Sequence, residues 1–346
     1  MEDYPGVMSF HTAGGGSIYQ IPVEVFPGFW GFVYLVLYED FRVLIDTGSG
    51  FGDSNAHLSE GFRQAADLAG QPLELSDLSH VLITHGHIDH FGGLNYVRAH
   101  TDALLGVHEL DRRIITNYEE RLTVVARRLE EYLTEAGTSE ENRADLLRMY
   151  RFTKALFHSV PVDFTYEAVG MRVGPFLVHH VPGHSAGHVV LRLHDILFSG
   201  DHVLEGTSPH QAPERLTLST GLEHYLQSLK SLEPIAKEVT LTLGGHKKPI
   251  TDLSSRLKDI SDLHAERLGK VLGFLTEPRT IVEVSKRLFG EVSGYNILLA
   301  LEETGAHIEY LYQRGLIEIA NLDELEENQK AVAIRYRRVE FVQRSI

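Results

Sequence analysis

Cysteine is absent from the 346-residue sequence. The chain therefore cannot form disulfides, bind a metal through thiolates or use a cysteine nucleophile. It also has no apolar run that approaches the about 20 residues needed for a membrane-spanning helix. Its first residues lack the basic start and the apolar segment of a signal peptide, so we expect a cytoplasmic protein that does not bind membranes.

Basic side chains are in the minority, with 32 Lys and Arg against 48 Asp and Glu and a net charge of -16. A protein that grips phosphate backbones usually has the opposite sign, so nucleic acid is a disfavoured partner, although a small basic groove is compatible with this charge. Histidine, in contrast, is plentiful. The chain has 20 histidines, and they cluster along the sequence, which favours metal binding over chance.

Strand and helix patterns alternate along the first part of the chain, which predicts the α/β class. Apolar and β-branched residues predict strands at 19–25, 29–38 and 41–45, and a helix follows at 54–69. A buried strand then ends at Ile83. Further strands are predicted at 164–169, 176–181, 189–193 and 239–243, with helices at 94–100 and 222–232.

Residues 109–158 have a different pattern. Apolar residues recur there at steps of three and four, which predicts a long amphipathic helix that Gly137 ends. Thr138 and Glu141 have the spacing of a capping box and predict a second helix to about residue 157. We interpret this segment as a helical hairpin inserted into the α/β body. It is either a packing element or part of a homodimer interface, or it is a lid that covers a functional site.

We expect one domain over residues 1–252 and a separate winged-helix-like domain over residues 253–346. Helices are expected at 257–275, 281–288 and 297–313, followed by strands at 316–319 and 331–337. The third helix carries three acidic residues, which phosphates repel, so reading of a DNA major groove is disfavoured. These residues are Glu302, Glu303 and Glu309. Basic residues that could contact a single strand follow later, at Lys330, Arg335, Arg337, Arg338 and Arg344.

The run Thr-His-Gly-His-Ile-Asp-His at 84–90 directly follows an apolar stretch. It places three imidazoles and one carboxylate within six residues, at the end of a predicted buried strand. Imidazole nitrogen and carboxylate oxygen are ligands for zinc and similar divalent metals. Alternate side chains of such a turn can point at two nearby positions, so the run predicts half of a two-metal site.

Four further motifs lie at the ends of predicted strands, where α/β proteins build their sites. Asp46 begins an Asp-Thr-Gly turn, and His184 lies in Pro-Gly-His-Ser-Ala-Gly-His at 182–188. Asp201 ends Ser-Gly-Asp at 199–201, and His246 ends Gly-Gly-His at 244–246. We expect His188 to have a structural role, with a hydrogen bond inside its own loop.

In this order, the five motifs resemble those of the metallo-β-lactamase superfamily, in its glyoxalase-II-like branch, over about residues 18–250. The tail also resembles a branch of β-lactamase-like proteins with a C-terminal winged helix. The resemblance implies an αββα sandwich and seven metal ligands. The first metal would be held by His85, His87 and His184, and the second by Asp89, His90 and His246, with Asp201 bridging both.

The same resemblance implies a hydrolase with two divalent metal ions, zinc in the first place and iron or manganese as alternatives. Asp46 would orient a ligand histidine by a hydrogen bond. A bridging hydroxide would attack a small carbonyl ester, a thioester or a lactone, with Asp201 and Asp89 as the catalytic carboxylates. Lys247 and Lys248 could bind a carboxylate or phosphate of the substrate.

Two other activities use related sites. A ribonuclease or other phosphodiesterase would use the same two metals, with the tail as a nucleic-acid arm. A sulfur dioxygenase would use one iron, and Asp89 and His246 argue against it because they indicate a second metal. His87 stands where flavodiiron proteins have glutamate, and Asp201 stands where true β-lactamases commonly have cysteine, so both of those activities are disfavoured.

Overall fold

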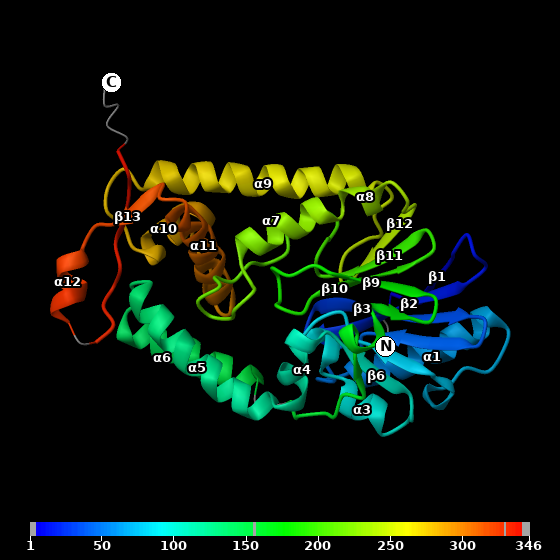
Figure 1. The fold of residues 1–346 in the computed structure, drawn as a ribbon. Coiled ribbons are helices and arrows are strands. Elements are labelled where there is room, and N and C mark those ends of the chain that lie inside the picture. Colours follow the sequence, from blue (N-terminus) through cyan, green and yellow to red (C-terminus); the bar gives the residue numbers. More distant parts are fainter. Residues whose placement is uncertain (1–4, 155–156, 329, 341–346) are drawn as a thin grey trace. The chain divides into compact units, whose positions relative to one another are not determined.

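A computed structural model describes residues 5–154, 157–328 and 330–340 (Figure 1). The chain forms two compact units, each built from segments that are distant in sequence. The first unit contains residues 1–121, 155–209 and 227–258, and the second contains residues 122–154, 210–226 and 259–346. Among the described residues, no helix is both long and apolar enough to cross a membrane.

A seven-stranded sheet with the order β1-β2-β3-β4-β5-β6-β7 forms one layer of the first unit. Strands β1 to β4 are antiparallel neighbours, whereas β4 to β7 run parallel. Their bounds are Met8–His11, Ser17–Phe26, Phe29–Tyr38, Phe41–Ile45, His80–Leu82, Leu104–Val107 and Phe164–Thr165. The strands predicted at 29–38 and 41–45 are confirmed to the residue, whereas β1 and β6 were not predicted.

A five-stranded sheet with the order β12-β11-β10-β9-β8 forms the second layer. Its strands, from β8 to β12, are Arg172–Val173, Phe176–His180, Val189–Leu193, Ile196–Gly200 and Leu241–Gly244. Strands β8 to β11 are antiparallel neighbours, and β11 pairs with β12 in parallel. The strand predicted at 164–169 is only partly correct, because residues 167–169 form a 3-10 turn after β7.

The inner faces of the two sheets share one hydrophobic core. Tyr34 of the first sheet and Phe198 of the second lie with ring centroids 5.2 Å apart. The other face of the seven-stranded sheet packs against α1 (Ser54–Ala69) and α3 (Leu94–Arg98) (Figure 1). A side chain at Gly61 of α1 would meet Ile21 of β2 at 2.1 Å, so glycine permits this close approach. The predicted α/β class and the packing of two sheets are confirmed.

Backbone hydrogen bonds tie the two sheets together at one edge. Within the second sheet, the amide of Gly245, after β12, donates to the carbonyl of Gly200 at the end of β11 (2.8 Å). The amide of Phe32 in β3 donates to Gly245 (2.7 Å), and that of Val189 in β10 donates to Thr84 after β5 (2.9 Å). Because β5 and β12 run parallel to their neighbours β4 and β11, the loops that follow these strands meet at this edge.

Helices dominate the second unit, where residues 122–154 share a hydrophobic core with the C-terminal segment. It contains most of α5 (Tyr118–Glu135) and of α9 (Leu253–Phe274), and the whole of α6 (Glu140–Lys154), α10 (Ile281–Phe289), α11 (Asn296–Gln313) and α12 (Leu322–Glu327) (Figure 1). The buried Tyr132 hydroxyl of α5 donates to the carbonyl of Leu301 in α11 (2.6 Å). The predicted domain limits and the winged-helix assignment stay predictions.

Several local predictions in this part of the chain are wrong. The long helix is interrupted at Asn117, between α4 (Glu109–Thr116) and α5. The second helix begins one residue later than the Thr138 capping box requires, because the Ser139 hydroxyl accepts from the amide of Asn142 (3.3 Å). Strand β14 is short, Tyr336–Arg338, and α12 separates it from β13 (Ile317–Ile319).

The acidic residues of α11 do not form a solvated face. Glu303 is 5% exposed, and its Oε1 accepts from the guanidinium of Arg267 (2.9 Å) while Oε2 accepts from the amide of Gln211 (2.8 Å). His264 and His307 complete a buried group that could hold a metal by its residue types alone. Because both Glu303 oxygens already accept hydrogen bonds, we interpret this group as an ion-pair network that stabilises the second unit.

Replacing Glu303 with Gln tests this interpretation. The change leaves the Arg267 guanidinium without its carboxylate, so we expect a loss of about 3 kcal/mol in the free energy of unfolding, measured by chemical denaturation. Glu266→Gln in α9 is the control, because Glu266 forms an exposed ion pair with Lys270 and its removal is expected to leave the midpoint unchanged. Equal midpoints for both variants would contradict the interpretation.

Candidate metal centre

The structure brings together all seven side chains that the sequence analysis assigned to metal binding, in two groups at the shared edge of the sheets. The ligand atoms within each group lie within 4.8 Å of one another. The first group is His85, His87 and His184, and the second is Asp89, His90, Asp201 and His246. Four of these residues are close together in the loop after β5 and in α2 (Ile88–Phe91).

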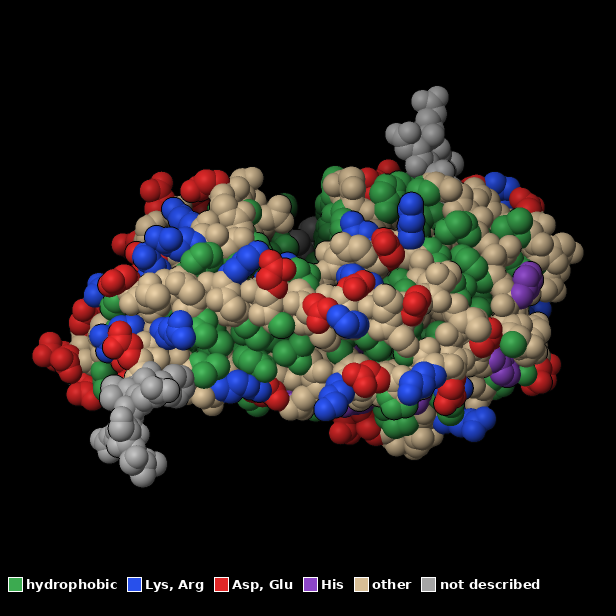
Figure 2. Space-filling view, turned by 90° about the horizontal axis from the view of Figure 1, so that it is seen from above, with side chains coloured by type: hydrophobic (Ala, Val, Ile, Leu, Met, Phe, Trp, Pro, Cys, Tyr) green, Lys and Arg blue, Asp and Glu red, His purple; other side chains and the backbone are tan. Residues whose placement is uncertain are grey.

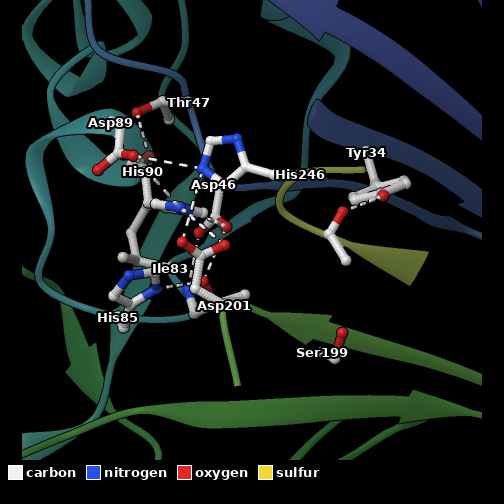
Figure 3. A network of polar contacts seen from close by, with 12 residues as sticks. Tyr34, Asp46, Thr47, Ile83, His85, Asp89, His90, Ser199, Asp201 and His246 are labelled. Atoms are coloured by element: carbon white, nitrogen blue, oxygen red, sulfur yellow. Dashed lines mark hydrogen bonds and ion pairs between the residues drawn. The ribbon is translucent and has the colours of Figure 1, made fainter. Parts of the chain in front are cut away.

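Asp201 belongs to the second group and also faces the first, and its carboxylate lies between His85 and His246 in Figure 3. Its Oδ2 is 3.9 Å from Nε2 of His184 in the first group and 3.5 Å from Nε2 of His246 in the second. Its Oδ1 is 3.5 Å from Nε2 of His90. Ligand atoms at about 2.1 Å from a tetrahedral zinc ion would be about 3.4 Å apart. The carboxylate therefore faces donors of both groups at separations close to those of a metal site.

Several ligand atoms are buried without a hydrogen-bond partner. They include Nε2 of His85, His90 and His246, and Oδ1 of Asp201. Burial lowers the pKa of His85 well below its usual value, so its ring is neutral and can offer a lone pair. Each buried polar atom left unsatisfied costs about 1–3 kcal/mol, a cost that a bound cation would remove. The donor set and its unsatisfied atoms therefore fit divalent metal ions.

Asp46 orients two of the ligands. Its Oδ2 contacts Nδ1 of His90 at 2.8 Å (Figure 3). Its Oδ1 and Oδ2 accept from the amide and hydroxyl of Thr84, both at 2.8 Å. Because the Thr84 hydroxyl donates to Asp46, it accepts from Nδ1 of His85 at 3.1 Å. Both rings thus present Nε2 to the metal groups. The Asp46 backbone has a positive φ of 60°, which Asp tolerates better than most residues.

Two further contacts hold ligands from outside the five motifs. Nδ1 of His246 is 2.8 Å from the carbonyl of Trp30, which fixes this ring with Nε2 toward the site. The Phe29 ring stacks on His246 with centroids 4.6 Å apart and is 44% exposed, so it forms an apolar surface beside the second group. Phe29 and Trp30 were predicted only as strand residues, because no motif marks them as neighbours of His246.

The prediction that His188 bonds within its own loop is wrong. Its Nε2 accepts from the amide of Asp201, in the loop after β11, at 3.1 Å. Its ring also stacks on His85, with centroids 4.5 Å apart and an interplanar angle of 19°. His188 therefore connects a ligand of the first group to the carboxylate between the groups.

In the absence of a metal ion, the imidazoles and carboxylates of the second group shift one another's pKa values in opposite directions. Burial would lower the pKa of His90, but the carboxylates of Asp201, Asp46 and Asp89 hold that pKa well above its usual value. Burial would raise the pKa of Asp201, but His246 and His90 hold it far below its usual value. A metal ion must displace protons from these imidazoles, so binding at the second group releases protons and weakens as the pH falls.

Lys247 and Lys248 lie on an exposed turn directly after His246. The Lys247 backbone is in the left-handed region, with a φ of 68°. Their predicted contact with a substrate anion stays a prediction.

The fold is a sandwich of two sheets, and one edge of it carries a group of three histidines beside a group of two histidines and two aspartates. This combination defines a class of metal-binding protein. The sequence model of the Metallo-beta-lactamase superfamily matches residues 28–259. The chain belongs to this superfamily, and the predicted resemblance is confirmed at the level of the superfamily, whereas its glyoxalase-II-like branch stays a prediction.

Relatives of known sequence and structure agree with this assignment. The chain is 28% identical over 293 residues to the probable metallo-hydrolase YqjP of Bacillus subtilis (strain 168), a match that covers 81% of this chain and 86% of that protein. A metallo-beta-lactamase family protein from Thermus thermophilus is 26% identical, with a TM-score of 0.73 and coverage of 93% of this chain and 98% of that one. A beta-lactamase domain protein from Burkholderia ambifaria shares the fold at 21% identity, with a TM-score of 0.71 and coverage of 96% and 94%.

Removing one ligand from each group tests the assignment. We expect the wild-type chain to retain about two divalent ions after dialysis, and His85→Ala and His246→Ala to retain about one each, measured by elemental analysis. The control is His11→Ala, which removes an exposed histidine of β1. A metal content of the two ligand variants equal to that of the control would contradict the assignment.

Asp46→Asn tests the orienting role of this carboxylate. Asn keeps the shape of the side chain and tolerates positive φ, but it lacks the charge that faces His90. We expect the affinity for metal to fall by about 10- to 100-fold, measured by competition with a chromophoric chelator, while the fold is retained. Asp40→Asn, in the exposed turn between β3 and β4, should leave the affinity unchanged. Equal affinities for the two variants would exclude the orienting role.

Proposed function

We propose that this chain is a hydrolase that uses two metal ions to open a small carbonyl ester, a thioester or a lactone. The observation that carries the proposal is the position of Asp201, which faces donors of both groups at 3.5–3.9 Å. The first ion would be held by the three histidines His85, His87 and His184. The second would be held by Asp89, His90 and His246, with Asp201 shared by both.

Two divalent ions at such a site supply a hydroxide nucleophile at neutral pH and positive charge that stabilises an oxyanion. Burial would raise the pKa of the two carboxylates that the chain adds, but neighbouring imidazoles, His90 beside Asp89 and His246 beside Asp201, hold these pKa values far below the usual range. Both are therefore acceptors that can orient water by a hydrogen bond. In this proposal, Asp201 would accept the remaining proton of the attacking hydroxide and pass it to the leaving group as the acyl bond breaks, and Phe29 would contact an apolar part of the substrate.

Zinc is the metal that we propose, because the ligands are imidazoles and carboxylates in groups of three and four. Iron and manganese bind the same ligand types, so availability also decides which metal is present. The second group, with His246 and Asp89 3.3 Å apart, supports two ions rather than the single iron of a sulfur dioxygenase.

An ester substrate is favoured over a nucleic acid by the charges of the chain, which has a net charge of -16. On the face shown in Figure 2, Lys and Arg side chains are interspersed with Asp and Glu side chains. Arg335 and Arg337 of the C-terminal segment form ion pairs with Glu324 (3.3 Å) and Glu318 (2.5 Å). Arg344 lies outside the described residues. These pairings reduce the charge available to a phosphate backbone.

A substrate panel tests the proposal. We expect the zinc-loaded chain to turn over at least one acyl thioester or lactone, to lose this activity on chelation and to regain it when zinc is restored. Asp201→Asn should lower kcat by about 100-fold or more, because it removes the charge between the ions, and His11→Ala should leave kcat unchanged. Full metal loading without ester turnover would contradict the proposal, and cleavage of single-stranded RNA that falls steeply with salt would favour the phosphodiesterase.

A further inference from the structure

A buried carboxylate outside the metal groups joins the two loops that carry the first group. Asp111 lies in the first turn of α4 and has no solvent exposure. Its Oδ2 accepts from the amide of Gly86 (2.7 Å) and the hydroxyl of Ser185 (3.0 Å), and its Oδ1 accepts from the amide of Gly187 (2.8 Å). Both carboxylate oxygens are therefore used inside the protein, and neither belongs to the two metal groups.

The three donors are placed around the ligands of the first group. Gly86 is the residue between His85 and His87, and Ser185 directly follows His184. Consecutive Cα atoms are only about 3.8 Å apart, so an amide held at Gly86 restricts the backbone of both neighbours. One carboxylate thus fixes the backbone beside all three imidazoles of the first group.

The glycines at these positions permit the approach of the carboxylate. A Cβ atom at Gly187 would lie 2.6 Å from Cγ of Asp111, a distance that real Cβ atoms essentially never show. A Cβ atom at Gly86 would lie 2.8 Å from Ile114 in α4 and 3.3 Å from Cγ of Asp111. The glycines of the two histidine motifs therefore have a shared role, which is to let α4 pack directly on both loops.

The end of α4 that carries Asp111 is itself anchored. His108 caps this helix, because its Nδ1 accepts from the amide of Leu110 (3.2 Å) while its Nε2 contacts Glu167 at 2.7 Å. The His108 ring stacks on His180 of β9, with centroids 3.8 Å apart. Nε2 of His180 in turn donates to the carbonyl of Ala186, in the loop that carries His184 (2.8 Å). These contacts hold Asp111 at a fixed place relative to the loop.

We propose that Asp111 is a positioning residue that sets the affinity of the first metal group without binding the metal. Among the described residues, Asp111 forms no hydrogen bond with the second group, which is supported by Asp46 behind His90 and the Trp30 carbonyl behind His246. Asp46 also reaches His85 of the first group through Thr84. Loss of the Asp111 carboxylate should therefore weaken one ion and spare the other. This inference rests on the proposed pair of metal ions, but it does not depend on which substrate is hydrolysed.

The experiment measures the two groups separately by placing Asp111→Asn in two backgrounds. In the His246→Ala background the retained ion reports on the first group, and in the His85→Ala background it reports on the second. Affinity for Zn²⁺ is measured by chelator competition, and the visible spectrum of the Co²⁺ form reports the ligand geometry. The matched control is Glu109→Gln, which changes an exposed carboxylate in the same turn of α4.

Asp111→Asn replaces one acceptor with an NH₂ group that cannot accept from an amide or hydroxyl. We expect the zinc affinity of the first group to fall by about 10- to 100-fold, with a changed Co²⁺ spectrum, and that of the second group to change by less than about twofold. Ser185→Ala keeps the carboxylate and removes one donor, so it should cause a smaller loss at the first group only. This milder variant tests the inference even when Asp111→Asn does not fold.

An equal loss of affinity at both groups, accompanied by a lower unfolding midpoint, would show that Asp111 only supports the fold and would overturn the inference. Unchanged affinity at the first group in Asp111→Asn and Ser185→Ala would also overturn it. The chain could bind two ions and lose affinity only at the first group in Asp111→Asn, yet hydrolyse no ester. That result would contradict the proposed function and leave the inference about Asp111 standing.

Discussion

Buried nitrogen and oxygen atoms without hydrogen-bond partners are the constraint on which the rest of this structure depends. At the edge of the sandwich, Nε2 of His85, His90 and His246 and Oδ1 of Asp201 all lie in this state. Burial without a partner costs about 1–3 kcal/mol for each such atom. In the second group, the buried imidazoles and carboxylates also shift one another's pKa values. A bound cation would satisfy these atoms together, so we expect metal binding and the stability of this edge to be linked.

Two buried carboxylates provide the supports that hold the ligands in place. Asp46 accepts from both Thr84 donors and contacts His90, whereas Asp111 connects the loops that carry His85, His87 and His184. In each case one carboxylate joins segments that are distant in sequence. The metal ligands thus depend on side chains that never need to touch the metal, which is a recurring feature of metal sites.

The local signals in the sequence predicted the structure best. The aromatic and β-branched run of β3 and the apolar run of β4 define their strands without tertiary information, and the spacing of His85, His87, Asp89 and His90 indicates metal chemistry within one turn. Local competition limited other predictions. Thr138 and Ser139 are both good helix caps, and the sequence does not decide between them, whereas the structure uses Ser139.

Partners that come from distant segments were not predictable. Asp111 is one acidic residue in a helix with other acidic residues, and only the fold shows that its carboxylate meets Gly86 and Gly187. Glu303 was singled out only as one of three acidic residues that disfavour DNA binding, and its burial against Arg267 was not predicted, because it depends on the segment after residue 209 that packs on α11. Periodicity gives the face of a helix but does not identify the segment that covers it.

The most direct test of the central claim is a crystal structure of the zinc-loaded chain with anomalous scattering data recorded at the zinc edge. We expect two anomalous peaks on either side of Asp201, each at about 2.0–2.2 Å from the imidazole nitrogens of its group. Imidazoles that point apart, or a map without a peak between them, would contradict it.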